Sequence, residues 1–167
     1  MADLAIRAAL PADAPAIAAI YAHHVLHGTA TFDTEPPGAD TWREKIEHCA
    51  QRGWPFLVAE REGAVCGLAY ATQFRDRPAY SRTCENSIYV DQRQIGAGIG
   101  RALLSQLIAA AQAAGFEQMI AVIGGAEPAS VALHSRLGFV EAGRMRNVGH
   151  KFGRTLDTLY MQLGLTA

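Results

Sequence analysis

The stretch QIGAGIGRALL, from Gln94 to Leu104, carries three alternating glycines and runs directly into a leucine-rich segment. The β-rich segment CENSIYV precedes it, so the glycines lie between an expected strand and an expected helix. The first N–H groups of a helix lack internal partners and the helix dipole is positive there, which favours an anion. Glycine also lacks the Cβ that would keep a phosphate away from these amides. The stretch therefore predicts contact with a phosphorylated ligand.

The common phosphate-binding motifs do not fit this stretch. A P-loop requires Gly-Lys followed by Ser or Thr, whereas Gly100 is followed by Arg101 and Ala102. A dinucleotide fingerprint, GxGxxG, counted from Gly96 would need its third glycine where Arg101 stands. A tight turn into a core helix, with no ligand, explains the glycines equally well. Taken alone, they leave the function open.

The composition is that of an ordinary globular protein. Of 167 residues, 50% are hydrophobic and 19% are charged, with a formal net charge of -1, which predicts a single domain over residues 1–167. The near-neutral charge argues against a nucleic-acid partner, and no apolar run predicts a membrane span. The N-terminus lacks a signal-peptide core, and Cys49, Cys66 and Cys84 lack CxxC spacing. We therefore expect free thiols and a cytoplasmic protein.

Hydrophobic periodicity and turn residues predict alternating strands and helices. We expect strands at 4–7, 55–60, 64–72, 84–90, 119–123 and 156–163. We expect helices after a cap at Asp13, over 41–51, from 99 to just before Gly115, and over 128–138. The basic segment GHKFGR, at 149–154, is typical of a solvated turn. The order predicts an α/β (α+β) fold with helices around a mixed sheet.

The chain resembles the GNAT superfamily of N-acetyltransferases in the segments ENSIYV, GAGIGRALL, GFEQMIAVI and SVALHSRLGF. The tail, LH-x-x-LGF followed by VG-x-KFG-x-x-LD, is most similar to the branch that acetylates phosphinothricin, methionine sulfoximine and methionine sulfone. The resemblance extends from IRAAL to LYMQL, nearly the whole chain. It implies a GNAT fold with a mixed twisted sheet, acetyl-CoA as co-substrate, a small amino-acid-like acceptor, a homodimer and no metal.

The resemblance also implies which residues contact acetyl-CoA. The pyrophosphate would lie on the main chain of the glycine stretch, and the pantetheine arm would run beside the preceding strand like an added strand. The implied residues are Ile88, Tyr89, Val90, Gly96, Ala97, Gly98, Ile99, Gly100, Arg101 and Glu127. Two positions depart from the family pattern, because Ile95 replaces a Gln or Arg and Glu127 replaces an asparagine. Either change is expected to weaken a cofactor contact and leaves the main-chain amides in place.

Acetyl transfer to an amine needs a base and a donor for the oxyanion, while the thiolate leaves without an acid. The resemblance makes Glu85 the candidate base, although its residue type alone indicates a solvated strand-edge glutamate. It gives His134 a comparable role, although a lone helical histidine is more often a core residue. The main-chain N–H of Val90 is the expected oxyanion donor.

The acceptor is expected to carry a carboxylate, and arginine pairs with carboxylates through two hydrogen bonds. The segment FRDRPAY therefore supplies candidate ligands, which otherwise would be a charged surface loop. The residues expected to line the acceptor site are Phe32, Arg75, Asp76, Arg77, Glu85, Asn86 and Ser87.

Other functions remain open from the sequence. His23 and His27 lie four residues apart, as a zinc pair on a helix would, but no third ligand has matching spacing. An aminoglycoside, a polyamine or a protein N-terminus is an alternative acceptor, for which an acidic pocket would be expected. A non-catalytic acyl-CoA sensor is the remaining alternative.

Overall fold

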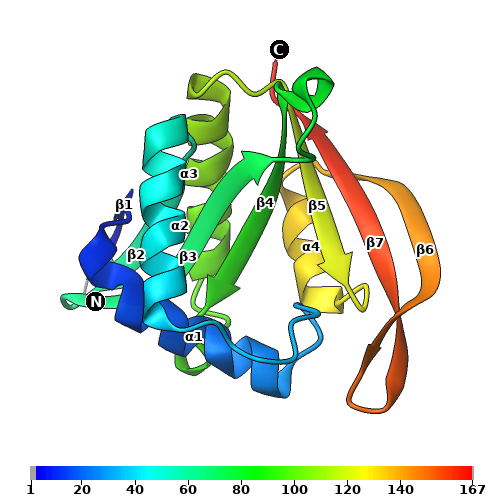
Figure 1. Cartoon of the computed structure of the whole chain (residues 1–167), viewed down its shortest axis with the longest axis horizontal. Coiled ribbons are helices and arrows are strands. Elements are labelled where there is room, and N and C mark those ends of the chain that lie inside the picture. Colours follow the sequence, from blue (N-terminus) through cyan, green and yellow to red (C-terminus); the bar gives the residue numbers. More distant parts are fainter. Residues whose placement is uncertain (1–2, 167) are drawn as a thin grey trace.

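The computed structural model describes residues 3–166 and contains one seven-stranded sheet with helices on both faces (Figure 1). The strands are β1 (Leu4–Ala8), β2 (Phe56–Arg61), β3 (Ala64–Gln73), β4 (Thr83–Val90), β5 (Gln118–Gly124), β6 (Val140–Lys151) and β7 (Arg154–Gly164). The helices are α1 (Ala14–His27), α2 (Ala39–Arg52), α3 (Ile99–Ala113) and α4 (Pro128–Arg136). The strand order is β1-β2-β3-β4-β5-β7-β6. Within residues 3–166, no helix combines the length and the apolar character needed to cross a membrane.

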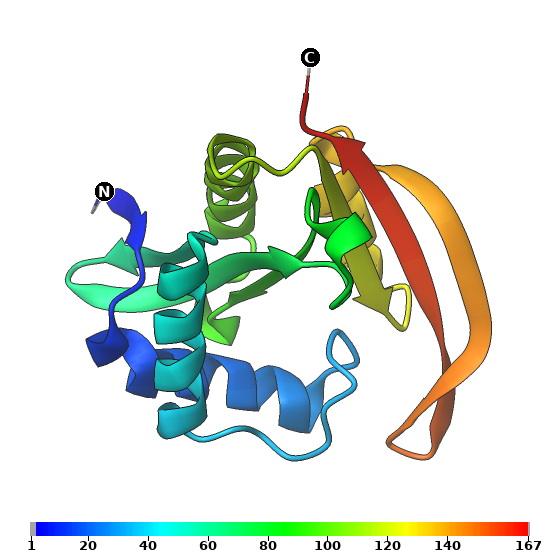
Figure 2. The same ribbon diagram turned by 45° about the horizontal axis from the view of Figure 1, so that its top comes forward.

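Two hydrophobic cores hold the helices against the sheet. On one face, Leu103, Leu104 and Leu107 of α3 pack against alternate residues of the strands, and all three are fully buried. On the other face, Ile17 of α1 and Trp42 of α2 pack against the intervening strand residues. This division follows from the strand period of two, which sends successive side chains to opposite faces. Figures 1 and 2 show α1 and α2 on one side of the sheet and α3 on the other.

The predicted mixed sheet with flanking helices is confirmed, and each predicted strand and helix has a counterpart. One strand was missed, because β6 is an edge strand whose residues are mostly exposed and show no apolar alternation. The interpretation of 149–154 as a solvated turn holds for the exposed Phe152 and Gly153 alone, since Gly149 to Lys151 end β6 and Arg154 begins β7. The predicted cap is also wrong, because the Asp13 carboxylate accepts from the N–H of Leu10 and from the guanidinium of Arg7.

One seam in the sheet differs from the others. β4 and β5 are parallel, whereas every other neighbouring pair of strands in the described sheet is antiparallel. Their pairing covers four residue pairs, from Thr83↔Gln118 to Asn86↔Ala121, and then stops. The last four residues of β4, residues 87–90, pair with β3 alone, so β4 and β5 diverge from this point. The divergence places a gap in the middle of the sheet.

Candidate functional site

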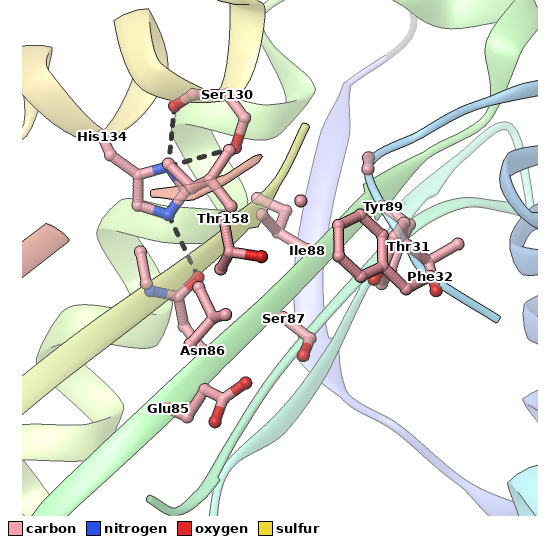
Figure 3. Close-up of a pocket in the computed structure, with 15 residues that line it drawn as sticks. Thr31, Phe32, Glu85, Asn86, Ser87, Ile88, Tyr89, Ser130, His134 and Thr158 are labelled. Atoms are coloured by element: carbon pink, nitrogen blue, oxygen red, sulfur yellow. Dashed lines mark hydrogen bonds between the residues drawn. The ribbon is translucent and has the colours of Figure 1, made fainter. Parts of the chain in front are cut away.

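Two adjoining cavities occupy the gap between β4 and β5. One, of about 420 Å³, is lined by the end of β4, the glycine stretch and the start of α4. The other, of about 220 Å³, is lined by the middle of β4, β5, α4 and the loop that follows α1 (Figure 3). Ile88, Tyr89, Ala30 and Ser130 line both cavities, so the two spaces adjoin. We call the larger the glycine-side cavity and the smaller the Glu85-side cavity.

The main chain of β4 presents polar groups to the gap. The N–H of Asp91 donates to the carbonyl of Cys66, and that of Phe74 donates to the carbonyl of Thr83, both at 2.9 Å. These two bonds show that the odd-numbered residues of β4 are the ones that hydrogen-bond to β3. In an antiparallel pair the intervening residues point their N–H and C=O away from the partner strand. Ile88 and Val90 are such residues, and their strand no longer pairs with β5. Their main-chain groups therefore face the gap, as the predicted donor role of Val90 requires.

His24, for which the sequence predicted no role in the site, forms a hydrogen bond with one of these main-chain groups. Its Nε2 atom lies 2.8 Å from the carbonyl oxygen of Val90. Burial lowers the pKa of His24, so the ring is neutral at pH 7 and donates this bond through Nε2–H. Only the three-dimensional packing of α1 against β4 reveals this partner, because the two residues are 66 positions apart.

The glycine stretch forms a cradle, which we define as residues 96–101, in which, among the described residues, only the amide of Ala97 is bonded, to the carbonyl of Gln94 at 3.3 Å. Gly96 and Gly98 have φ values of +85° and +80°, a region that strains residues with a Cβ. α3 begins at Ile99, and its first internal bond is that of Ala102 to the carbonyl of Gly98, at 3.1 Å. Within residues 3–166, the N–H groups of Gly96 and of residues 98–101 donate to no carbonyl or side chain.

The side chains around the cradle leave it accessible. Ile95 lines the glycine-side cavity and is 65% exposed. Gly100 also lines it, and a Cβ there would lie 3.4 Å from the Leu133 side chain of α4. The cradle therefore combines a helix N-terminus, unpaired amides and a cavity, which is the arrangement that binds phosphate groups.

Glu127, the second departure from the family pattern, has a structural role. Its carboxylate accepts a 2.9 Å hydrogen bond from the N–H of Ser130 and caps the N-terminus of α4. The same residue lines the glycine-side cavity. An acidic side chain at this position is thus occupied in helix capping, where its charge also suits the helix dipole.

Glu85 lies beside Arg75 at the Glu85-side cavity. The guanidinium of Arg75 lies 3.3 Å from the Glu85 carboxylate and also donates to the carbonyl of Phe74. Burial raises the pKa of Glu85, and the positive charge of Arg75 opposes part of this effect. A carboxylate with a raised pKa is a stronger base than an exposed one, and it faces a cavity of small-molecule size.

His134 reaches the same gap from the opposite face of β4. Its Nδ1 atom lies 2.8 Å from the carbonyl of Ser130, and its Nε2 atom lies 3.1 Å from Oδ1 of Asn86 (Figure 3). The ring is 2% exposed, and burial lowers its pKa, so the neutral form dominates at pH 7. The neutral ring has one N–H and lies between two acceptor oxygens, the Ser130 carbonyl and Oδ1 of Asn86. The Nδ2 atom of Asn86 faces the carbonyl of Ile120 at 3.5 Å.

The structure brings most of the predicted acceptor residues together. Phe32, Glu85, Asn86 and Ser87 line one cavity, and Figure 3 shows Phe32 across that cavity from His134. Arg75 adjoins this group through Glu85, whereas Asp76 and Arg77 lie on the exposed loop and do not line the cavity. The predicted cofactor residues converge in the same way: Ile88, Tyr89, Val90, Gly96, Gly98, Ile99, Gly100 and Glu127 line the glycine-side cavity. Ala97 and Arg101 lie within the cradle itself.

The histidine pair of α1 gains no further ligands. The rings of His23 and His27 lie 4.8 Å apart between centroids. Among residues 3–166, no group of three or more His, Cys, Asp or Glu side chains converges as a metal site would require.

Comparison with known proteins identifies the family. A family model described as Acetyltransferase (GNAT) domain matches residues 6–160. Phosphinothricin N-acetyltransferase of Alcaligenes faecalis is 47% identical over 156 residues, which cover 93% of this chain and 79% of the relative. The L-methionine sulfoximine/L-methionine sulfone acetyltransferase of Salmonella typhimurium is 40% identical over 162 residues, covering 97% and 95%. The crystal structure of a GNAT phosphinothricin acetyltransferase from Sinorhizobium meliloti, in complex with AcCoA, has a TM-score of 0.94 at 46% identity and covers 96% of this chain and 88% of that one.

The parallel seam that opens at Asn86, the free amides of Gly96 and residues 98–101, and this extent of similarity agree with one another. The chain belongs to the GNAT family of acetyltransferases.

Proposed function

We propose that the protein transfers the acetyl group of acetyl-CoA to the α-amino group of a small amino-acid-like acceptor. The acceptors we expect are methionine sulfoximine, methionine sulfone and phosphinothricin. These compounds appear in the names of the relatives described above. The observation that carries the proposal is the opened seam, which joins a cradle of free amides to a cavity lined by Glu85 and His134.

The residues of the glycine-side cavity fit acetyl-CoA. Free N–H groups at the start of α3 suit its pyrophosphate, and the gap-facing main chain of Ile88 and Val90 suits the amides of its pantetheine arm. The Glu127 carboxylate is committed to Ser130 and therefore offers this arm at most its remaining lone pairs. When bound, acetyl-CoA supplies an acetyl group activated as a thioester.

The chain's own residues supply the proton acceptor and the oxyanion donor. An amino group attacks only when neutral, so a base must take its proton. Glu85 and His134 both line the gap and are the two candidate proton acceptors. Burial lowers the pKa of His134, so its ring is neutral at pH 7. The N–H of Val90 points into the gap and can donate to the carbonyl oxygen under attack. Direct transfer between two bound substrates then requires no covalent enzyme intermediate.

Arg75 favours an acceptor with a carboxylate. Its guanidinium is half exposed beside Glu85 and has donors left to pair with an anionic group. An acceptor held there through its carboxylate would place its α-amino group near the Glu85 carboxylate. The relation between the two residues thus supports an amino acid as the acceptor.

A thiol-release assay tests this function. Purified protein with acetyl-CoA should release CoA when methionine sulfoximine, methionine sulfone or phosphinothricin is added, and no CoA should be released without an acceptor. A panel containing spermidine, an aminoglycoside and an alanine-terminated peptide distinguishes other amine acceptors. Calorimetric binding of acetyl-CoA without turnover on the whole panel would replace the enzyme with an acyl-CoA sensor.

We also propose a cytoplasmic homodimer. The edge strand β6 supports the dimer, because Val140, Met145 and Val148 on it are 65%, 43% and 48% exposed. The three free, buried thiols of Cys49, Cys66 and Cys84 support a reducing compartment. Light scattering during gel filtration tests the dimer, and replacement of Val148 by Lys should shift the population toward monomer.

A further inference from the structure

The loop between α1 and α2, residues 28–38, forms a wall of both cavities. Its first part, Gly28 to Ala30, lines the glycine-side cavity, and Ala30, Thr31 and Phe32 line the Glu85-side cavity. Figure 3 shows Thr31 and Phe32 across the cavity from His134. The loop contains no helix or strand, so contacts with other elements must set the position of this wall.

The C-terminal hairpin of β6 and β7 makes one of these contacts through a buried lysine. The Nζ atom of Lys151 donates to the carbonyl oxygen of Thr31 at 2.8 Å. Both residues are buried, with 5% of Lys151 and 7% of Thr31 exposed. A buried ammonium group is costly unless it is hydrogen-bonded, and a residue such as methionine would fill the same space without that cost. The hydrogen bond from Lys151 to the Thr31 carbonyl therefore offsets part of the cost of burying the ammonium group.

Side chains around Thr31 extend this contact. The hydroxyl of Thr31 lies 2.7 Å from that of Tyr21, which also donates to the carboxylate of Asp33. The Asp33 carboxylate favours the charged form of Lys151, while burial lowers the pKa of that lysine. The loop is thus tied to α1 on one side and to the hairpin on the other.

The second contact is between the Phe32 ring and two glycines. A Cβ added to Gly149 on β6 would lie 2.3 Å from Cε2 of Phe32, and one added to Gly124 on β5 would lie 2.9 Å from Cε1. Neither glycine has a positive φ, so close contact and not backbone conformation requires glycine there. At Gly149 this contact is the Phe32 ring, and at Gly124 it is the ring together with the Thr29 carbonyl, which would lie 2.8 Å from an added Cβ. The hairpin therefore contacts two of the three loop residues that line the Glu85-side cavity, Thr31 and Phe32.

We infer that the C-terminal hairpin sets the acceptor pocket, with Lys151 as a positioning residue that holds the Thr31 carbonyl and thereby the Phe32 ring. The inference rests on the proposed function for its meaning, because the pocket is the one we assign to the acceptor. Lys151 does not line the Glu85-side cavity, so it acts through the loop. Lys151 holds the Thr31 carbonyl, and the absence of a side chain at Gly149 leaves room for the Phe32 ring beside it.

The test compares Lys151→Met with Arg154→Met. Arg154 is the register partner of Lys151 on β7 and is exposed, so it matches the loss of one positive charge on the same hairpin. We expect Lys151→Met to raise the KM of the acceptor about tenfold, the effect of one charged hydrogen bond, and to change the KM of acetyl-CoA less than twofold. Arg154→Met should leave both within twofold of the parent values.

A second measurement does not depend on turnover. Hydrogen–deuterium exchange of residues 29–34 should become at least tenfold faster in Lys151→Met and stay unchanged in Arg154→Met. Unchanged exchange together with an unchanged acceptor KM would overturn the inference. If the parent protein acetylates no acceptor, the proposed function fails, while the exchange measurement still decides whether Lys151 holds the loop.

Gly149→Ala provides the second variant if Lys151→Met does not fold. The added methyl displaces the Phe32 ring and leaves the Lys151 bond in place. We expect the acceptor KM to rise at least fivefold and the preference among methionine sulfoximine, methionine sulfone and phosphinothricin to change. Parent values for both quantities would contradict the inference, because the hairpin would then not determine where the ring lies.

Discussion

The Nε2 atom of His24 lies 2.8 Å from the carbonyl oxygen of Val90, the last residue of β4. On the opposite side of the same peptide unit, the N–H of Asp91 donates to the carbonyl of Cys66 at 2.9 Å. The peptide that follows Val90 is thus held from both sides. This arrangement keeps the N–H of Val90 directed into the gap, where we place the oxyanion.

His24→Leu should therefore lower kcat about tenfold, because the loss of one hydrogen bond leaves a partly buried carbonyl unpaired and frees the end of β4. His24→Gln, which keeps a donor, should recover part of the activity. His27→Leu, on the exposed end of α1, serves as the control and should retain parent kinetics. Steady-state rates of CoA release measure all three, and equal rates for the parent and His24→Leu would remove His24 from the mechanism.

Glu85→Gln should lower kcat/KM by about 100-fold or more, which is the contribution of a general base. The same variant should be more stable than the parent at pH 7.5. Because burial raises the pKa of Glu85, the folded state binds its proton more tightly than the unfolded state, and stability falls as pH rises through that pKa. Thermal unfolding should show the difference shrinking toward pH 4. Glu117→Gln, which removes an exposed partner of Arg82, should not show this pH dependence.

Asn86→Asp should raise the pKa of His134, because it places a negative charge 3.1 Å from Nε2. If His134, in place of Glu85, takes the proton of the amine, the acidic limb of the pH profile of kcat/KM moves to higher pH in this variant. The double variant Asn86→Asp, His134→Gln is the control, since it keeps the new charge and removes the ring. A limb that moves equally in both variants would assign the base to Glu85.

Gly98→Ala should raise the dissociation constant of acetyl-CoA about fivefold to tenfold. Gly98 has a φ of +80°, and alanine in this region costs about 1 kcal/mol, so the cradle amides would shift. Gly115→Ala is the matched control, because Gly115 has a φ of +96° beyond the other end of α3. Both variants should lose similar thermal stability, but calorimetry should find weaker acetyl-CoA binding in Gly98→Ala alone.

Arg75→Ala should raise the KM of the acceptor about tenfold and leave that of acetyl-CoA unchanged. The variant should also raise the pKa of Glu85 further, since Arg75 is the charge that lowers it, and move the acidic limb to higher pH. Arg77→Ala changes the same charge on the same loop, away from the cavity. A similar increase in KM for both variants would indicate long-range attraction of the acceptor instead of a direct clamp.

The buried elements of this fold were predictable because their apolar residues repeat with a clear period. The long run of leucines in α3 and the compact strand β5 are examples. β6 was not predictable in this way, because its outward position at the sheet edge leaves polar and apolar residues equally exposed. Its register also shifts at Glu141/Gly143 and at Met145/Gly149, which disrupts any regular alternation.

The site residues also divide into those that local sequence groups together and those that only the fold brings together. The cradle glycines and Glu85 stand in one continuous segment, so local sequence was enough to group them. His24 and Lys151 acquire their roles from carbonyl groups 66 and 120 positions away, and a carbonyl has no signature in the sequence. Glu127 was interpreted as a cofactor contact alone, although its place immediately before Pro128, a residue type favoured at the first position of a helix, indicates a cap.

The four residue pairs between β4 and β5 have a mechanical consequence. They are the strand pairing that joins two parts of the sheet, β1 to β4 and β5 to β7, which also share the hydrophobic core under α3. A substrate that binds the free amides of α3 and also contacts α4 would connect these two parts further. Part of its affinity would then appear as resistance to heat, so the melting temperature of the protein should respond to acetyl-CoA more than to a fragment that occupies the cradle alone.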